Sequence, residues 1–78
     1  MILRNRIKDA RRASGLTQSR LAEDVAVSRK TINTIENGVF VPSTLLALKI
    51  AARLGVPVEH LFWLAEEAPE RNVSEPSR

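Results

Sequence analysis

The stretch that decides the fold is TQSRLAEDVAVSRKTINTIENG, residues 17–38 of a 78-residue chain. Its pattern predicts two short helices, at about 18–25 and about 29–37, joined by a tight turn. Thr17 and Ser28 stand where a side-chain hydroxyl caps the first turn of a helix, and Gly38 is a typical helix stop. We therefore expect two helices in tandem near the middle of the chain.

The segment 29–37 is unusual for a helix, because only Ile32 and Ile35 in it are apolar. These two side chains lie three residues apart and share one face. Cationic and hydrogen-bonding side chains occupy the face away from them, namely Arg29, Lys30, Asn33 and Thr34. A polar surface on a helix held by two isoleucines suits a groove of DNA.

These residues resemble the helix-turn-helix of the Cro/C1-type regulators, also called the XRE family. The resemblance extends from residues 5–8 and Arg11 through residues 41–56. It implies a compact, all-α, five-helix, lambda-repressor-like DNA-binding domain over residues 1–65. The Glu-, Pro-, Ser-, Arg- and Asn-rich residues 66–78 are expected to be a disordered tail.

The remaining helices follow from apolar spacing and from stop signals. A helix is expected over about 3–14, ended by Gly15, and another from a cap at Ser43 to a stop at Gly55. A short helix is expected from Pro57 to about Ala65. Its core residues are Val58, Leu61 and Phe62, and Phe40 in the preceding linker is expected to pack on the same core.

Base contacts are expected from the first half of the helix at 29–37. Arg29 and Lys30 can each reach O6 and N7 of guanine, and a threonine methyl can pack on a thymine methyl. Thr34 is favoured over Asn33 for the next base contact. Phosphate contacts are expected from residues near helix ends, and the resemblance supports Gln18 in particular. The candidates are Thr17, Gln18, Arg20, Ser28, Thr31 and Asn37.

Two residues depart from the pattern that this family shows. Arg20 replaces the usual glutamate of a capping box, so a cation opposes the helix dipole unless a phosphate lies nearby. Ala26 replaces the usual glycine of the turn. A left-handed alanine costs roughly 1 to 2 kcal/mol, and the alternative is an altered turn.

The resemblance also implies a structural ion pair between Arg11 and Glu36, which ties the first helix to the end of the helix at 29–37. The apolar excess toward the C-terminal part of the domain suggests a contact with a second subunit. Val58, Trp63 and Leu64 are the candidates for this interface.

Composition excludes several classes of protein. There is no cysteine, so disulfides and thiolate metal sites are absent, and no catalytic constellation surrounds His60, the only histidine. We therefore expect no enzyme, no metal and no cofactor. No signal peptide or membrane span is expected, which favours a cytoplasmic protein. Residues 1–38 carry eight Lys and Arg against four Asp and Glu, so the basic surplus coincides with the DNA-binding stretch.

The function predicted from the sequence is a homodimeric transcriptional regulator, a repressor that reads a palindromic operator in double-stranded DNA. One alternative is an antitoxin of the same fold, with a toxin as protein partner, or a restriction-controller protein. Another is a helical protein-interaction module that does not bind DNA; the intact basic face at 29–37 argues against it.

Overall fold

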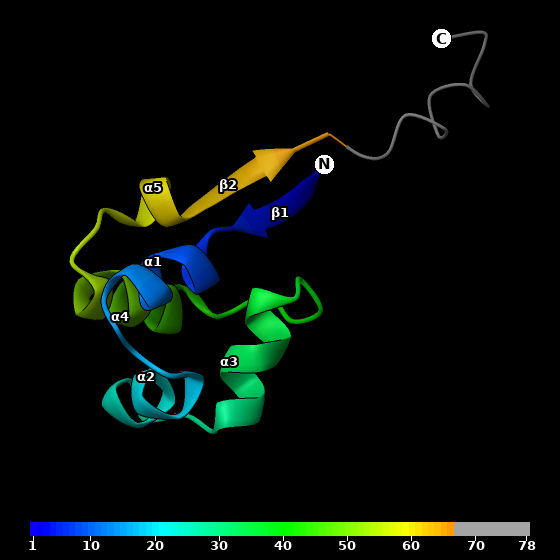
Figure 1. Ribbon diagram of the computed structural model, residues 1–78. Coiled ribbons are helices and arrows are strands. Elements are labelled where there is room, and N and C mark those ends of the chain that lie inside the picture. The colour runs from blue at the N-terminus through cyan, green and yellow to red at the C-terminus, as the bar shows by residue number, and fades with distance from the viewer. Residues whose placement is uncertain (67–78) are drawn as a thin grey trace, which may run out of the picture.

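The computed structural model describes residues 1–66, which form a mostly helical domain with a small sheet (Figure 1). The elements in chain order are β1 (Ile2–Asn5), α1 (Ile7–Ala13), α2 (Gln18–Asp24), α3 (Arg29–Glu36), α4 (Thr44–Leu54), α5 (Val58–Leu61) and β2 (Phe62–Ala65). The expectation of a mostly helical fold is confirmed, but the fold is not purely α, because β1 and β2 form a small sheet. The tail expected after Glu66 lies outside the described residues.

The sheet replaces the ends of two expected helices. β1 pairs with β2 in antiparallel register, with Leu3 opposite Leu64 and Arg4 opposite Trp63. The pairing continues past the strands, since the Arg6 N–H donates to the Leu61 carbonyl at 3.0 Å. The helix expected from residue 3 therefore begins at Ile7, and the one expected to reach residue 65 ends at Leu61. Interstrand hydrogen bonds, with the strand preference of aromatic residues in β2, outweigh the local helical spacing.

Three hydroxyl caps begin helices where the sequence predicts them. Thr17, Ser28 and Ser43 each accept a hydrogen bond from the backbone N–H three residues on, at 3.0, 3.1 and 3.1 Å. Gly55 ends α4 in the left-handed conformation, with φ of 72°. Pro57 differs slightly from expectation, because it precedes α5 as its N-cap and is not in its first turn.

The turn between α2 and α3 contains a strained residue. Ala26 has φ of 63°, the only non-glycine residue of positive φ among residues 1–66. The turn therefore keeps the left-handed geometry at the cost of strain, and the alternative of an altered turn does not occur. The Val27 N–H closes it on the Ala22 carbonyl at 2.9 Å.

The core draws at least one fully buried side chain from every helix. The side chains with 0% exposure are Ile7, Leu21, Ile32, Ile35, Ile50 and Leu61. Each such side chain stabilises the fold by about 1.5 to 3 kcal/mol relative to an exposed one. Val58 and Phe62 pack partly buried against this cluster, which confirms their expected place. The buried side of α3 is therefore fixed by two isoleucines, as its sequence indicates.

Phe40 does not pack on the core, contrary to expectation. Phe40 is 49% exposed. The loop after α3 is held through its backbone, because the N–H groups of Val39 and Phe40 both donate to the Thr34 carbonyl, at 2.9 and 3.2 Å. These bonds direct the loop without requiring its side chains to be buried.

Replacing Ala26 by glycine should stabilise the protein. Relief of left-handed strain is worth about 1 to 2 kcal/mol, and the greater freedom of glycine in the unfolded chain costs about 0.4 to 1 kcal/mol. We expect a net gain of roughly 0.5 to 1 kcal/mol in the free energy of unfolding by urea titration. Ala52→Gly, on the exposed side of α4, is the control and should lose about 1 kcal/mol. A loss at Ala26 as large as at Ala52 would contradict this account.

Candidate nucleic-acid interface

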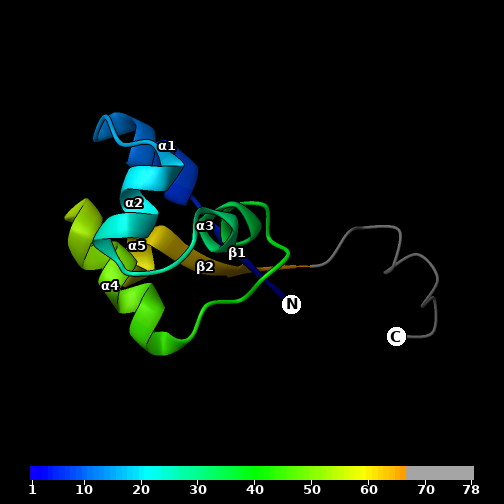
Figure 2. The same cartoon turned by 90° about the horizontal axis from the view of Figure 1, so that it is seen from below.

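α3 presents a polar surface at the end of the domain away from the sheet. α2 and α3 pack together there, as Figure 1 and the view in Figure 2 both show. Ile32 and Ile35 are fully buried beneath the helix. Arg29 and Lys30, in the first turn, are exposed, and their side chains form no hydrogen bond or ion pair with another described residue. Two cations are thus available to a ligand that meets this helix.

The other two base-contact candidates, Asn33 and Thr34, are half-buried on the same helix. The Thr34 hydroxyl donates to the Thr31 carbonyl at 3.0 Å, which leaves the methyl group and an acceptor lone pair for other contacts. The Asn33 side-chain oxygen accepts from the Asn37 amide at 2.6 Å. The Asn33 amide N–H groups are the part of that side chain still able to donate.

The phosphate candidates are placed in four different surroundings. Ser28 and Thr31 lie at the start of α3, where their hydroxyl oxygens are 3.0 Å apart, whereas Asn37 lies at its other end. Thr17 and Gln18 line a hollow of about 560 Å³ between α1, α2 and α3. Arg20 is separate from that hollow, on the outer side of α2.

Arg20 has a protein partner in the structure. Its Nε lies 3.2 Å from Asp24 Oδ1, one turn along α2, and Arg53 Nε of α4 lies 2.7 Å from Asp24 Oδ2. The hydrogen bond from Arg53, helped by the nearby charge of Arg20, lowers the pKa of Asp24. A phosphate that approached Arg20 would therefore have to share this cation with Asp24.

The pair of Arg11 and Glu36 lies between α1 and the end of α3. Arg11 Nε is 2.7 Å from Glu36 Oε2, and the two side chains are only 9% and 2% exposed. Gln18 of α2 donates its amide N–H to Glu36 Oε1 at 3.0 Å, and Arg11 also donates to the Leu16 carbonyl at 2.8 Å. One buried carboxylate thus connects three helices.

Asn5 makes a further connection that the sequence reasoning missed. Its amide donates to the Ile35 carbonyl at 2.9 Å, and its side-chain oxygen accepts from the Ile7 N–H at 3.1 Å. The second bond satisfies a free N–H at the start of α1. An asparagine two residues before an apolar helical stripe is the signal that could have indicated it.

Two cations beside the interface were also missed. Lys8 and Arg12 of α1 line the same hollow as Thr17, Gln18 and Arg29. Their spacing of four residues places them on one side of α1 and could have identified them as a pair. Nothing in the local sequence of α1 reveals that this side faces the start of α3.

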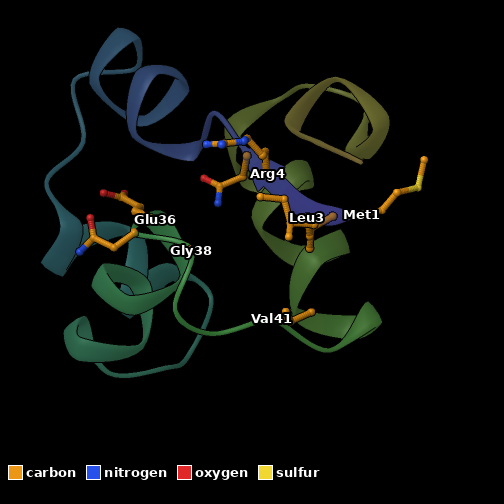
Figure 3. Close-up of a pocket in the computed structure, with 9 residues that line it drawn as sticks. Met1, Leu3, Arg4, Glu36, Gly38 and Val41 are labelled. Atoms are coloured by element: carbon orange, nitrogen blue, oxygen red, sulfur yellow. The ribbon is translucent and has the colours of Figure 1, made fainter. Parts of the chain in front are cut away.

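A second hollow, of about 510 Å³, lies between β1 and the end of α3 (Figure 3). Apolar side chains such as Leu3 and Val41 line it together with Arg4 and Glu36. Among residues 1–66, no three His, Cys, Asp or Glu side chains gather closely enough to hold a metal ion. No helix in this part of the chain is long and apolar enough to cross a membrane.

The chain is similar to helix-turn-helix transcriptional regulators over most of its length. A model of the helix-turn-helix family matches residues 7–61. The uncharacterized HTH-type transcriptional regulator YgzD of Bacillus subtilis is 45% identical over 65 residues, which are 83% of this chain and 98% of that protein. An uncharacterized HTH-type transcriptional regulator of Methanocaldococcus jannaschii is 45% identical over 60 residues, or 77% of this chain and 91% of that protein.

Two crystal structures have a similar fold. A Bacteroides fragilis protein of proposed DNA-binding function has a TM-score of 0.73 and 29% identity, and the match covers 80% of this chain and all of that one. The restriction-modification controller protein C.AhdI of Aeromonas hydrophila has a TM-score of 0.66 and 28% identity, covering 69% of this chain and 82% of that one.

Removing the Glu36 carboxylate should strongly destabilise the fold. Glu36→Ala leaves the buried Arg11 guanidinium without its counter-charge, which costs about 3 to 5 kcal/mol. The loss is measured as a lower urea midpoint. Glu23→Ala is the control, because it removes an exposed carboxylate from α2. It should change stability by less than about 0.5 kcal/mol. Equal stability of the two variants would show that the buried pair is not a structural support.

Proposed function

The chain belongs to the Cro/C1-type (XRE) helix-turn-helix family of transcriptional regulators, and we propose that it is a homodimeric repressor that reads a palindromic operator through the major groove. One observation carries the proposal. The first turn of α3 exposes Arg29 and Lys30, without partners among residues 1–66, on a helix fixed from behind by the fully buried Ile32 and Ile35. A rigid helix with free donors is what base recognition requires.

Sequence readout is assigned to one side of α3. Arg29 and Lys30 donate to O6 and N7 of guanine, and Thr34 packs its methyl group on a thymine. Thr34 is favoured over Asn33, whose side-chain oxygen is already bonded to Asn37. Asn33 retains amide N–H groups for an acceptor on a base and is the second choice at this position.

Phosphate contacts flank this readout surface. Gln18 donates one amide N–H to Glu36 and keeps its second for a phosphate, and the Thr17 hydroxyl accepts from Arg20 N–H but can still donate. Ser28 and Thr31 at the start of α3, and Asn37 at its end, supply further donors. Arg20 contributes charge while it remains close to Asp24.

A dimer is proposed because one α3 reads only a few base pairs. Two copies that meet half-sites about 34 Å apart, one turn of DNA, read twice as many. The binding of both to a promoter would block access by the transcription machinery. The dimer contact is proposed for the apolar surface around α5 and β2, which lie across the domain from the first turn of α3 in Figure 1.

Val58 and Leu64 are the stronger interface candidates. Val58 lines an apolar hollow of about 260 Å³ with Leu3, Leu48 and Phe62. Leu64 stands opposite Leu3 in the sheet, on the same face, and is 62% exposed. Trp63 projects from the other face of the strand, where the Arg6 guanidinium lies 4.5 Å from its ring centroid. Trp63 therefore contacts a partner only if the interface extends around the strand.

A restriction-controller role is the second candidate function, and the likeness to C.AhdI favours it. It uses the same DNA-reading surface and differs only in the genes that are regulated. The antitoxin alternative adds a toxin partner, and the alternative of a module without DNA binding predicts no affinity for any duplex. An adjacent restriction gene would favour the controller role, and an adjacent toxin gene would favour the antitoxin role. A DNA-binding assay tests the alternative of a module that does not bind DNA.

Selection from random duplex DNA tests the proposed function. We expect the wild type to enrich a palindrome with half-sites about one helical turn apart. Arg29→Ala and Lys30→Ala should each relax particular positions by about 1 to 3 kcal/mol. Lys49→Ala, an exposed lysine of α4, is the control and should leave the enriched sequence unchanged. If no sequence is enriched even at low salt, DNA recognition is not the function of this chain alone.

Sedimentation of the free protein tests the proposed dimer contact. The wild type should be dimeric at micromolar concentration, and Leu64→Ser should weaken the dimer because it removes apolar area from the interface. Val39→Ser, at a side chain 77% exposed in the loop after α3, is the matched control and should remain dimeric. A wild type that is monomeric both free and on DNA would disprove the dimer.

A further inference from the structure

We propose that Lys8 and Arg12 of α1 hold phosphates of the DNA backbone in the hollow that they border together with the start of α2 and Arg29 of α3. The inference rests on the proposed function and extends it to a helix outside the helix-turn-helix. The three cations line one open hollow of about 560 Å³, along with Thr17, Gln18 and Ser19 of the α2 start.

The charge around this hollow is not neutralised by the protein. Arg11 also borders it, but Glu36 accepts its hydrogen bond at 2.7 Å. Lys8, Arg12 and Arg29 are exposed and have no carboxylate partner among residues 1–66, and no Asp or Glu lines the hollow. Three like charges around one space repel each other, and an anion that enters this space relieves the repulsion.

Three of the four other exposed arginines among residues 1–66 have partners, and Arg4 of β1 is the exception. Arg20 and Arg53 both ion-pair with Asp24, and Arg6 stacks over the ring of Trp63. The absence of partners around the hollow is therefore not a general property of arginines in this domain. The unpartnered cations of the hollow lie on the side of the molecule that carries the start of α3.

The neutral groups of the hollow are also suited to phosphate. Hydroxyls of Thr17 and Ser19 can donate to phosphate oxygens, and the Gln18 amide has one N–H left after its bond to Glu36 at 3.0 Å. Cations together with hydroxyl and amide donors are the usual partners of backbone phosphates. Because Arg29 borders both the hollow and the readout surface, a phosphate held there would position the DNA for α3.

The salt dependence of DNA binding tests the proposal. Affinities of Lys8→Ala, Arg12→Ala and the double variant are measured on a selected duplex and on a random one, between about 50 and 200 mM salt. Each single change should reduce the slope of log K against log salt by about 1, and the double change by about 2. Both duplexes should lose affinity by the same factor, because phosphates carry no sequence information.

Matched variants separate this effect from unfolding and from general loss of charge. Lys49→Ala removes an exposed lysine on α4 and should leave the slope unchanged. Lys8→Arg and Arg12→Lys should retain most of the slope. Lys8→Gln and Arg12→Gln should each reduce the slope by about 1, while the urea midpoint stays at the wild-type value.

The outcomes distinguish this inference from the proposed function. If the wild type binds the selected duplex but the slopes of the Lys8 and Arg12 variants are unchanged, α1 does not hold phosphate and only this inference fails. If the wild type binds no duplex, the proposed function fails as well. Titration of the protein with inorganic phosphate is a further test. If the wild type binds phosphate saturably, the double variant does not, and the salt slope of DNA binding is the same in both, the hollow binds a small anion and the proposal is overturned.

Discussion

The structure depends on how the end of α3 is held. The Glu36 carboxylate accepts hydrogen bonds from Arg11 of α1 and Gln18 of α2, and the carbonyl of the preceding residue, Ile35, accepts one from Asn5 at the end of β1. Because the Glu36 side chain is only 2% exposed, its charge must be matched inside the protein. The hydrogen bonds to this carboxylate hold α1 and α2 in fixed positions relative to α3, and the Asn5 bond holds β1. The end of α3 therefore sets the arrangement of the helix-turn-helix.

This arrangement separates support from recognition within a single eight-residue helix. Ile32, Ile35 and Glu36 face the domain, where apolar burial and the ion pair fix the helix. Arg29 and Lys30 face away, and their side chains form no hydrogen bond with another described residue. A recognition helix gains from this division, because its backbone is already fixed before DNA binds and only the freedom of the donor side chains is lost.

The sequence was informative where structure depends on neighbours in the chain. The caps at Thr17, Ser28 and Ser43 and the two isoleucines of α3 follow from local patterns, and the structure confirms them. The strands were missed because their pairing joins residues about sixty positions apart, which helical periodicity cannot reveal. The exposure of Phe40 was missed for a different reason. Backbone hydrogen bonds to the Thr34 carbonyl fix that loop whatever its side chains are. The base and phosphate contacts remain predictions.

The distribution of charge follows the same separation of support and recognition. Arg11 and Arg53 form ion pairs that join elements distant in sequence, and these ion pairs support the fold. The cations of the hollow and of the first turn of α3 stay without carboxylates, although they repel each other. A small domain tolerates that repulsion because the exposed charges are screened by solvent, whereas a buried charge without a partner would cost several kcal/mol. The proposed DNA-binding surface can therefore stay cationic because its charges are exposed, whereas the buried charge of Arg11 is matched by Glu36.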